Sequence, residues 1–314
     1  SKIKLNEIIL DKERNNKLLI ETEHFLLDLK RQNIDNKILD YFEKLFKIII
    51  LPRITFMKQG SMTNITEERE VLHFLLRDNK DCNFFEETKK FKYIFQTKEK
   101  INDFVKQIQN GTINAFGNKF KTILSIGIGG SYLGVECVYE ALKYIPHYKS
   151  INSLDLMFLS NIDPASWTEI ANRINIETTL ILVISKSFTT IETLQNFLFV
   201  KNTIFEFYKK NKNDKTDKEI VENHFCAISS NIDKCLEYGF MNEKIFPMWD
   251  WVGGRFSVSS AVGQLPLSLA FSCDVFQEFL NGMHWIDVQF FSEDKVINNP
   301  AVILALFDNF NVHI

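Results

Sequence analysis

The chain has 314 residues, of which 45% are hydrophobic and 25% are charged. These proportions are typical of a globular protein with a large core, and they exclude a chain that is disordered throughout. The net charge of −3 at pH 7 and the isoelectric point near 6.1 give no support for binding to nucleic acid or to an anionic membrane. Any positively charged binding site must therefore be local.

The five cysteines and six histidines show no spacing that indicates a disulfide framework or a metal site. The cysteines form no Cys-x-x-Cys pair and their number is odd, which favours reduced thiols. The histidines form no His-Glu-x-x-His motif and no cluster with cysteine, so we expect no metal. The N-terminus lacks the apolar core of a signal peptide, and no apolar run approaches the ~18 residues of a membrane span. We therefore expect a soluble, cytoplasmic protein.

The first 95 residues are expected to form a helical segment that precedes the main domain. Up to about residue 51, apolar residues recur at helical spacing, and Pro52 is expected to end this helix. A turn follows at 60–64, and Thr66, with two glutamates directly after it, is expected to begin a second helix. The apolar face of the first helix comprises Ile34, Ile38, Leu39, Phe42, Leu45, Phe46 and Ile49.

His73 and Arg77 lie on this second helix. A surface pair, or a histidine with a local hydrogen-bond partner, is the simpler interpretation of them. The charged stretch 78–92 suits a surface connection. A further amphipathic helix is expected near 98–109, and Gly111 is expected to end it.

From residue 96 to 268, short apolar runs alternate with segments long enough for helices. This alternation predicts a parallel sheet with helices on both faces, which is a three-layer αβα sandwich. In such sheets, ligands bind beyond the carboxyl ends of the strands. The expected strands cover 122–128, 154–160, 178–184, 224–229 and 245–249.

The loop at 185–190 has the composition of an anion-binding site. It follows the expected strand at 178–184, and the apolar pattern of a helix begins directly after it. Free N–H groups and the positive end of the helix dipole would face the loop. A capping box between Thr189 and Glu192, which only begins the helix, is the simpler alternative. The hydroxyl groups of the loop belong to Ser185, Ser187, Thr189 and Thr190.

A glycine-rich loop follows the expected strand at 122–128. Residues 127–134 read Gly-Ile-Gly-Gly-Ser-Tyr-Leu-Gly, which invites a dinucleotide-binding interpretation. However, the motif Gly-x-Gly-x-x-Gly needs a glycine where Tyr132 stands, and the chain has no Gly-Lys-Ser/Thr motif. Two hypotheses remain. The turn brings backbone close to a small polar ligand, with a hydroxyl from Ser131, or it serves packing alone.

A third loop, within 250–263, holds two glycines directly before Arg255. They allow a tight backbone turn, so the guanidinium could be held beside a ligand oxygen. The alternative is a surface ion pair between Arg255 and Asp250. Elsewhere, we expect a solvated polar insertion at 209–219, a helix at 263–279 interrupted near Pro266, and another helix from residue 301.

Taken in order, the three loops resemble the glucose-6-phosphate isomerase family. The resemblance rests on Ile-Gly-Gly-Ser at 128–131, Ser-Lys-Ser-Phe-Thr-Thr at 185–190 and Gly-Gly-Arg-Phe-Ser at 253–257. Segments near residues 64–77 and 299–306 are also similar to that family. The resemblance therefore covers nearly the whole chain after about residue 64.

This resemblance implies a homodimeric enzyme that interconverts glucose 6-phosphate and fructose 6-phosphate without a cofactor or metal. It implies two sugar-isomerase domains in each subunit. We expect a helical segment at 1–95, a phosphate-binding sugar-isomerase domain at 96–268 and the start of a second such domain at 269–314. Arg255 would lie beside C1 and C2, where an enediolate develops. The substrate-binding residues would be Gly130, Ser131, Ser185, Lys186, Ser187, Thr189 and Thr190.

The chain also departs from the family pattern. Ser187 stands where the family usually has threonine, and Ser259 where it usually has tryptophan. The family's general base, a glutamate in a Met-Glu-Ser-Asn-Gly segment, its ring-opening histidine and a further lysine would lie beyond residue 314. Glu192 is the stand-in within the chain, but we expect it to cap its helix. We therefore expect these 314 residues alone to have negligible turnover.

Two other functions remain open. A regulatory module of the same fold would bind a sugar phosphate and need no base. A nicotinamide-dependent oxidoreductase would need the glycine that Tyr132 replaces.

Overall fold

The computed structural model describes residues 4–77, 89–151, 154–211, 214–292 and 295–313. The chain divides into two compact units, Leu72–Asn281 and a second unit that combines Ser1–Val71 with Gly282–Ile314. The division falls inside the helix α13 (Cys273–Phe290). The domain limits at 95 and 268 stay a prediction.

The unit Leu72–Asn281 is built on a five-stranded sheet with the order β4-β3-β5-β6-β7, in which all neighbours are parallel. All five predicted strands are confirmed, and their ends lie within two residues of the expected ones. In the register, Thr122 lies opposite both Asp155 and Thr179. The strands are β3 (Thr122–Ile126), β4 (Asp155–Leu159), β5 (Thr179–Ile184), β6 (Phe225–Ser229) and β7 (Ile245–Pro247).

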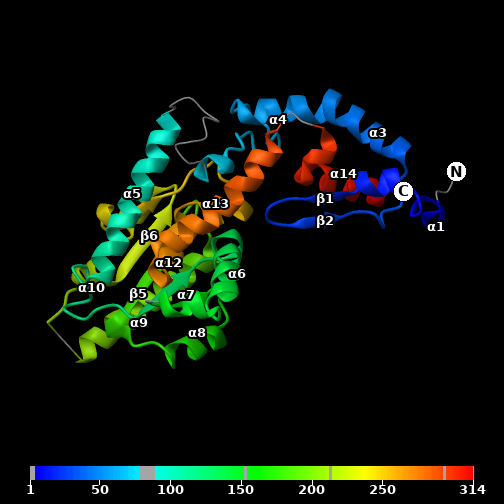
Figure 1. Ribbon diagram of the computed structural model, residues 1–314. Helices are drawn as coiled ribbons and strands as arrows, with labels where there is room; N and C mark the ends of the chain where they lie inside the picture. Colours follow the sequence, from blue (N-terminus) through cyan, green and yellow to red (C-terminus); the bar gives the residue numbers. More distant parts are fainter. Residues whose placement is uncertain (1–3, 78–88, 152–153, 212–213, 293–294, 314) are drawn as a thin grey trace. The chain divides into compact units, whose positions relative to one another are not determined.

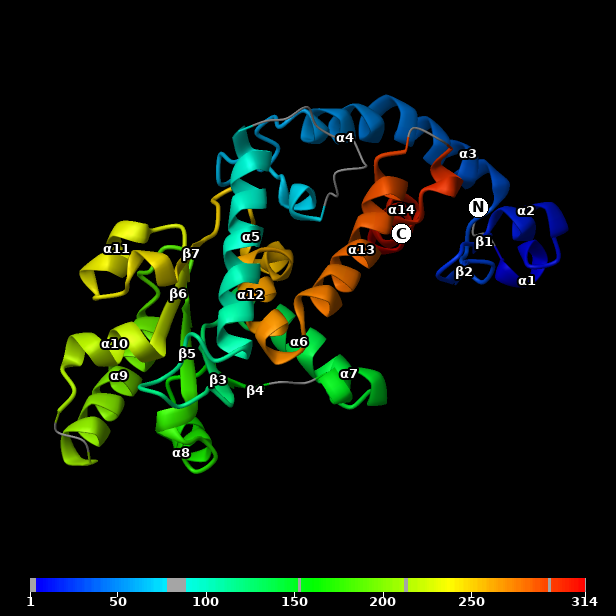
Figure 2. The same cartoon turned by 60° about the vertical axis from the view of Figure 1, so that its left-hand side comes forward.

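Helices cover both faces of this sheet, as the αβα interpretation predicts (Figures 1 and 2). One face packs against α5 (Lys89–Gln109), α6 (Leu133–Leu142) and α12 (Ala261–Ala270). The other face packs against α9 (Ile191–Asn211) and α10 (Asp217–His224). The shorter helices of this unit are α7 (Pro146–Ile151), α8 (Pro164–Ala171) and α11 (Ile232–Glu237).

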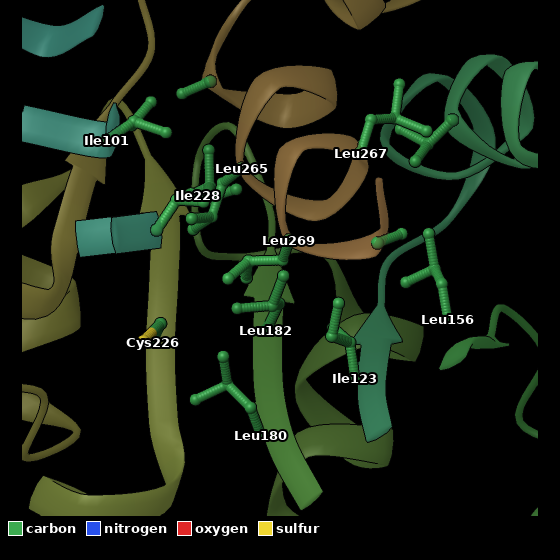
Figure 3. Close-up of a cluster of buried hydrophobic side chains, with 14 of the residues drawn as sticks. Ile101, Ile123, Leu156, Leu180, Leu182, Cys226, Ile228, Leu265, Leu267 and Leu269 are labelled. Atoms are coloured by element: carbon green, nitrogen blue, oxygen red, sulfur yellow. The ribbon is translucent and has the colours of Figure 1, made fainter. Parts of the chain in front are cut away.

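Strand β5 shows why the strands read as continuous apolar runs. Its residues are all buried, and successive side chains point to opposite faces. Leu180 and Leu182 belong to the core beneath α12, together with Leu269 (Figure 3). Ile181 and Val183 belong to the core beneath α9. Both faces of the sheet are therefore covered, and only the edges and ends of the strands remain for function.

A buried histidine at the C-terminal end of α10 links α9 to strand β5. His224 is fully buried; its Nε2 lies 2.7 Å from the hydroxyl oxygen of Tyr208, and its Nδ1 lies 2.9 Å from the carbonyl oxygen of Thr179. A carbonyl only accepts, so Nδ1 carries the proton and the tyrosine hydroxyl donates to Nε2. Burial lowers the pKa of His224 to about 4. The ring is therefore neutral at physiological pH.

In its described residues, the other unit consists of helices, turns and one hairpin. It contains α1 (Leu5–Ile8), α2 (Lys12–Lys17), the antiparallel strands β1 (Leu19–Glu21) and β2 (Leu26–Asp28), α3 (Asn36–Leu45) and α4 (Leu51–Lys58). The C-terminal part of α13 and α14 (Pro300–His313) complete it. The hairpin contradicts the expectation of helix throughout this stretch.

Two expectations for helix ends in this region are also wrong. Pro52 does not end a helix: α3, a π-helical turn at Phe46–Ile50 and α4 follow one another without a break, and the proline lies directly after the π turn, where the regular hydrogen-bond ladder is already interrupted. Thr66 begins no helix. Residues 65–68 form a turn closed by the bridge between Asn64 and Arg69, and only a 3₁₀ helix, η2 (His73–Leu76), follows.

Three boundaries in the larger unit also differ from the sequence expectations. α5 begins at Lys89, earlier than expected, so residues 89–92 of the expected surface connection at 78–92 are helical; residues 78–88 lie outside the described residues. Within the expected polar insertion at 209–219, α9 extends to Asn211 and α10 begins at Asp217, where Thr216 and Glu219 form a capping box. Pro266 lies inside α12, and the break falls at Phe271 instead.

Candidate functional site

Three loops, which follow β3, β5 and β7, meet at the carboxyl edge of the sheet. The first contains the 3₁₀ helix η3 (Gly129–Ser131), the second is 185–190, and the third contains the 3₁₀ helix η6 (Gly254–Ser259). A Cβ on Gly127 would lie 3.1 Å from both the carbonyl oxygen of Ile184 and the Cβ of Ser131. The first two loops therefore leave the sheet side by side, because neighbouring parallel strands end at the same edge.

The first and third loops are packed backbone to backbone. A Cβ on Gly130 would lie 2.1 Å from the carbonyl oxygen of Gly254, which is too close for two non-bonded atoms. Ser257 Oγ lies 3.0 Å from the carbonyl oxygen of Gly130 and 2.7 Å from that of Gly254. The glycine at 130 is thus required by this loop contact, so its presence alone is no evidence for a ligand.

A buried aromatic residue anchors the 185–190 loop in the core beneath α9. Phe188 adopts a positive φ of 53°, which costs a non-glycine residue about 1–2 kcal/mol. Its side chain is fully buried against Phe197, Tyr238 and Phe240. This burial offsets the backbone strain.

The hydroxyl groups of this loop lie in two pairs, one exposed and one partly buried. Ser187 Oγ lies 2.6 Å from Thr189 Oγ1, and both residues are exposed. Ser185 is buried, and its Oγ lies 3.4 Å from Thr190 Oγ1. The hydroxyls therefore form two pairs around the start of the helix that follows.

The capping box proposed as an alternative does not fit the start of α9. The helix begins at Ile191, which places Thr190 rather than Thr189 at the capping position. Among the described residues, no hydrogen bond joins Thr189 to Glu192. The first N–H groups of this helix thus face the 185–190 loop, where an anion is favoured.

Lys186 joins the second loop to the third. Its Nζ donates to the carbonyl oxygens of Asp250 at 2.9 Å and Val252 at 3.1 Å, and it lies 3.9 Å from Asp250 Oδ1. The structure therefore pairs Asp250 with Lys186, and the alternative pair of Arg255 with Asp250 is wrong.

Arg255 lies on η6 between two anchored neighbours. Its side chain is exposed, and no hydrogen bond or ion pair joins its guanidinium to another residue in the described part of the chain. Ser259, where the family usually has tryptophan, is buried and its Oγ donates to the carbonyl oxygen of Phe256 at 3.2 Å. The guanidinium is therefore available to a ligand.

His73 is the site neighbour that the sequence interpretation missed. Its ring stacks on that of Phe256, with centroids 4.5 Å apart and planes 15° from parallel. Burial, and then the positive charge of Arg77, lower the pKa of His73 to about 4. Arg77 is only 7% exposed, so neither a surface pair nor a locally satisfied histidine describes these residues. The only signal was that both lie in a segment that resembles the family.

Other chemistry has little support among the described residues. Burial raises the pKa of the Cys226 thiol to about 12 and that of Cys235 to about 11, so neither is an activated nucleophile. The described residues contain no group of three His, Cys, Asp or Glu side chains that could hold a metal ion. No helix in the described ranges is long and apolar enough to cross a membrane. Asp250, which pairs with Lys186, is the one carboxylate in the three loops.

The fold and site define a class: an α/β protein with a candidate anion site at the carboxyl edge of a parallel sheet. The family model described as phosphoglucose isomerase matches residues 28–314. The chain belongs to the phosphoglucose isomerase family.

The chain is 35% identical to a glucose-6-phosphate isomerase of Plasmodium falciparum. The alignment runs over 345 residues and covers 98% of this chain and 55% of the relative. It is 36% identical to the cytosolic isomerase 1 of Clarkia mildrediae, over 98% of this chain and 53% of that one. The chain thus spans about half the length of the curated relatives it matches.

One solved structure of the same family agrees with this assignment, and a second shares the fold. A crystal structure of a glucose-6-phosphate isomerase from Chlamydia trachomatis matches 98% of this chain and 58% of its own, with a TM-score of 0.76 and 26% identity. A hypothetical protein from Thermus thermophilus matches 88% of this chain and 55% of its own, with a TM-score of 0.62. Its 18% identity makes that a similarity of fold alone.

Proposed function

We propose that this chain serves in the interconversion of glucose 6-phosphate and fructose 6-phosphate, by acid–base proton transfer between C1 and C2 through an enediolate. The observation that supports the proposal is the meeting of three loops at one sheet edge, where hydroxyls, a helix N-terminus, a lysine and an arginine gather. Family membership supports the same reaction.

In this proposal the 185–190 loop binds the phosphate. Ser185, Ser187, Thr189 and Thr190 supply hydroxyl donors, and Lys186 supplies a charged one. Hydrogen bonds to charged groups contribute about 1.5–3 kcal/mol each, so a few of them would anchor the dianion. Binding energy from this non-reacting end can then position the reacting carbons. Gly130 and Ser131 would line the same site from the first loop.

Arg255 is proposed to face C1 and C2. A fixed cation at the developing enediolate would stabilise the transition state by about 3–4 kcal/mol, the range found for oxyanion-hole donors. The three loops supply no free base, because Asp250 is paired with Lys186. We propose that the catalytic glutamate, the ring-opening histidine and a further lysine come from sequence outside these 314 residues.

The proposal extends to the whole protein. Residues 96–268 would be a sugar-isomerase domain, the active protein would be a homodimer in the cytoplasm, and no cofactor would be needed. The cytosolic relatives support the location. The shortage of a base in the loops favours one rival, a sugar-phosphate-binding regulatory module of the same fold.

Two measurements separate these functions. First, fructose 6-phosphate should raise the melting temperature of the 314-residue chain, whereas NAD should not; the reverse result would favour the oxidoreductase. Second, an assay coupled to glucose-6-phosphate dehydrogenase should detect turnover by the full-length protein and negligible turnover by the 314 residues. A full-length protein that binds the sugar phosphate without turning it over would be the regulatory module.

A further inference from the structure

The 3₁₀ helix η2 contacts the third loop on both sides of Arg255. Before the arginine, the backbone N–H of Leu72 donates to the carbonyl oxygen of Trp251 at 3.4 Å. After it, the ring of Phe256 stacks on His73. All of these residues belong to the unit Leu72–Asn281. A segment far away in the sequence therefore supports the loop that carries the arginine.

Arg255 depends on its neighbours for its position. Its own side chain is exposed and makes no bond to another described residue. Phe256, the next residue, is 50% exposed, and its ring stacks on His73 and lies beside Gly253. Ser257 is anchored on the carbonyl oxygen of Gly130. With Phe256 and Ser257 both held, the backbone of η6 places Arg255 at one point.

We propose that His73 is a positioning residue that, through its stack on Phe256, holds η6 in the place from which Arg255 reaches the reacting carbons. The role of Arg255 in this inference rests on the proposed function. The role of His73 in fixing the loop does not, because it follows from the contacts alone.

A phenylalanine at position 73 provides a control that separates the ring stack from the other properties of histidine. His73 Nδ1 is buried and has no hydrogen-bond partner among the described residues, which is unfavourable. A phenylalanine would keep the flat ring and remove the unpaired nitrogen. The variant His73→Phe should therefore preserve the stack and raise the melting temperature, whereas His73→Ala should remove the stack.

The first experiment measures amide hydrogen exchange in the 314-residue chain. The probes are the η6 amides that bond locally, Phe256 N to Gly253 O at 3.0 Å and Ser260 N to Ser257 O at 2.9 Å. In His73→Ala they should exchange about tenfold faster, and in His73→Phe at the wild-type rate, since local openings govern exchange. Phe199→Ala is the matched control: Phe199 is 51% exposed and contacts Trp167, on the far side of the sheet.

Unchanged exchange at η6 in His73→Ala would overturn the inference. So would an equal acceleration at the β5 amides, because that would report a general loss of stability. This readout needs no activity, so it decides the inference even if the wild-type protein proves not to be an isomerase.

The second experiment measures kinetics of the full-length protein. His73→Ala should lower kcat about tenfold and change KM for fructose 6-phosphate less than twofold, because misplacement of a transition-state group affects the chemical step. His73→Phe should restore kcat. A higher KM at unchanged kcat, or failure of His73→Phe to restore kcat, would contradict the positioning role. Absence of turnover in the wild type would refute the proposed function instead.

Discussion

Ser257 Oγ lies 3.0 Å from the carbonyl oxygen of Gly130, 127 residues away in the sequence. This hydroxyl joins the loop that carries Arg255 to the loop that carries Ser131. The space between the two backbones is too small for a methyl group. The geometry of the candidate site therefore depends on a contact that involves no candidate ligand-binding side chain.

Gly130→Ala should destabilise the protein. Its Cβ would lie 2.1 Å from the backbone oxygen of Gly254, and backbone cannot move aside as a flexible side chain can. We expect a loss of about 1–3 kcal/mol in the free energy of unfolding, measured by urea denaturation. Gly282→Ala is the control, because a Cβ there would meet nothing within 4 Å and alanine favours helix α13 by about 0.5–1 kcal/mol. Equal effects of the two changes would contradict this account.

Thr190→Val should weaken the binding of fructose 6-phosphate about tenfold, because it removes one hydroxyl donor and keeps the shape. The affinity of the 314-residue chain can be measured by calorimetry. Thr203→Val is the matched control, within the helix that Thr190 precedes: its hydroxyl donates to the carbonyl oxygen of Phe199 in the same helix. If Thr190→Val binds like the wild type, the phosphate does not use this hydroxyl.

Arg255→Met should lower kcat of the full-length protein by a factor of about 10²–10³, the cost of removing an oxyanion-hole donor. The affinity for inorganic phosphate should change little, since the 185–190 loop is proposed to bind that group. Stopped-time assays with purified variants measure the first quantity and calorimetry the second. A large loss of phosphate affinity would place Arg255 at the phosphate end of the substrate instead.

Acid should destabilise the protein through His224. Its pKa is about 4 when folded and near 6.5 when unfolded, so between these values the unfolded chain binds more protons. Stability from this group is therefore complete above about pH 6.5 and is lost as the pH falls towards 4, by up to about 3 kcal/mol. The lowered pKa of His73 also makes the folded protein less stable in acid.

The measurement is the free energy of unfolding as a function of pH. In His224→Gln the decrease between pH 6.5 and 4 should be smaller than in the wild type. His147→Gln, at an exposed position, should follow the wild-type curve. A slope that is equal in all three proteins would show that His224 does not titrate in this range.

The parts of the fold that the sequence predicted are those where one physical pattern dominates. β5 is buried on both faces, so its apolar run is continuous and its limits are clear. The strands β1 and β2 were missed because each has three residues with only the middle one partly buried, too little for a periodic signal. Pro52 misled because a π-helical turn directly before it lets the proline stand inside one continuous helical run, and no sequence pattern marks such a turn.

The candidate site divides in the same way. Loops that follow strands could be placed at one sheet edge by topology alone, so the meeting of the 185–190 loop with the other two was foreseeable. The partner of Asp250 was not, because Lys186 and Arg255 are both cations and no spacing distinguishes them. The stack of His73 on Phe256 joins two segments whose proximity no local pattern encodes.

Lys186 donates hydrogen bonds to two carbonyl oxygens of the third loop. These bonds affect how the results of substitutions in this site must be interpreted. Removing the lysine would disturb the arginine's surroundings as well as any anion that the lysine binds. Effects of single and double changes at positions 186 and 255 should then fail to add, and only a complete thermodynamic cycle would apportion them.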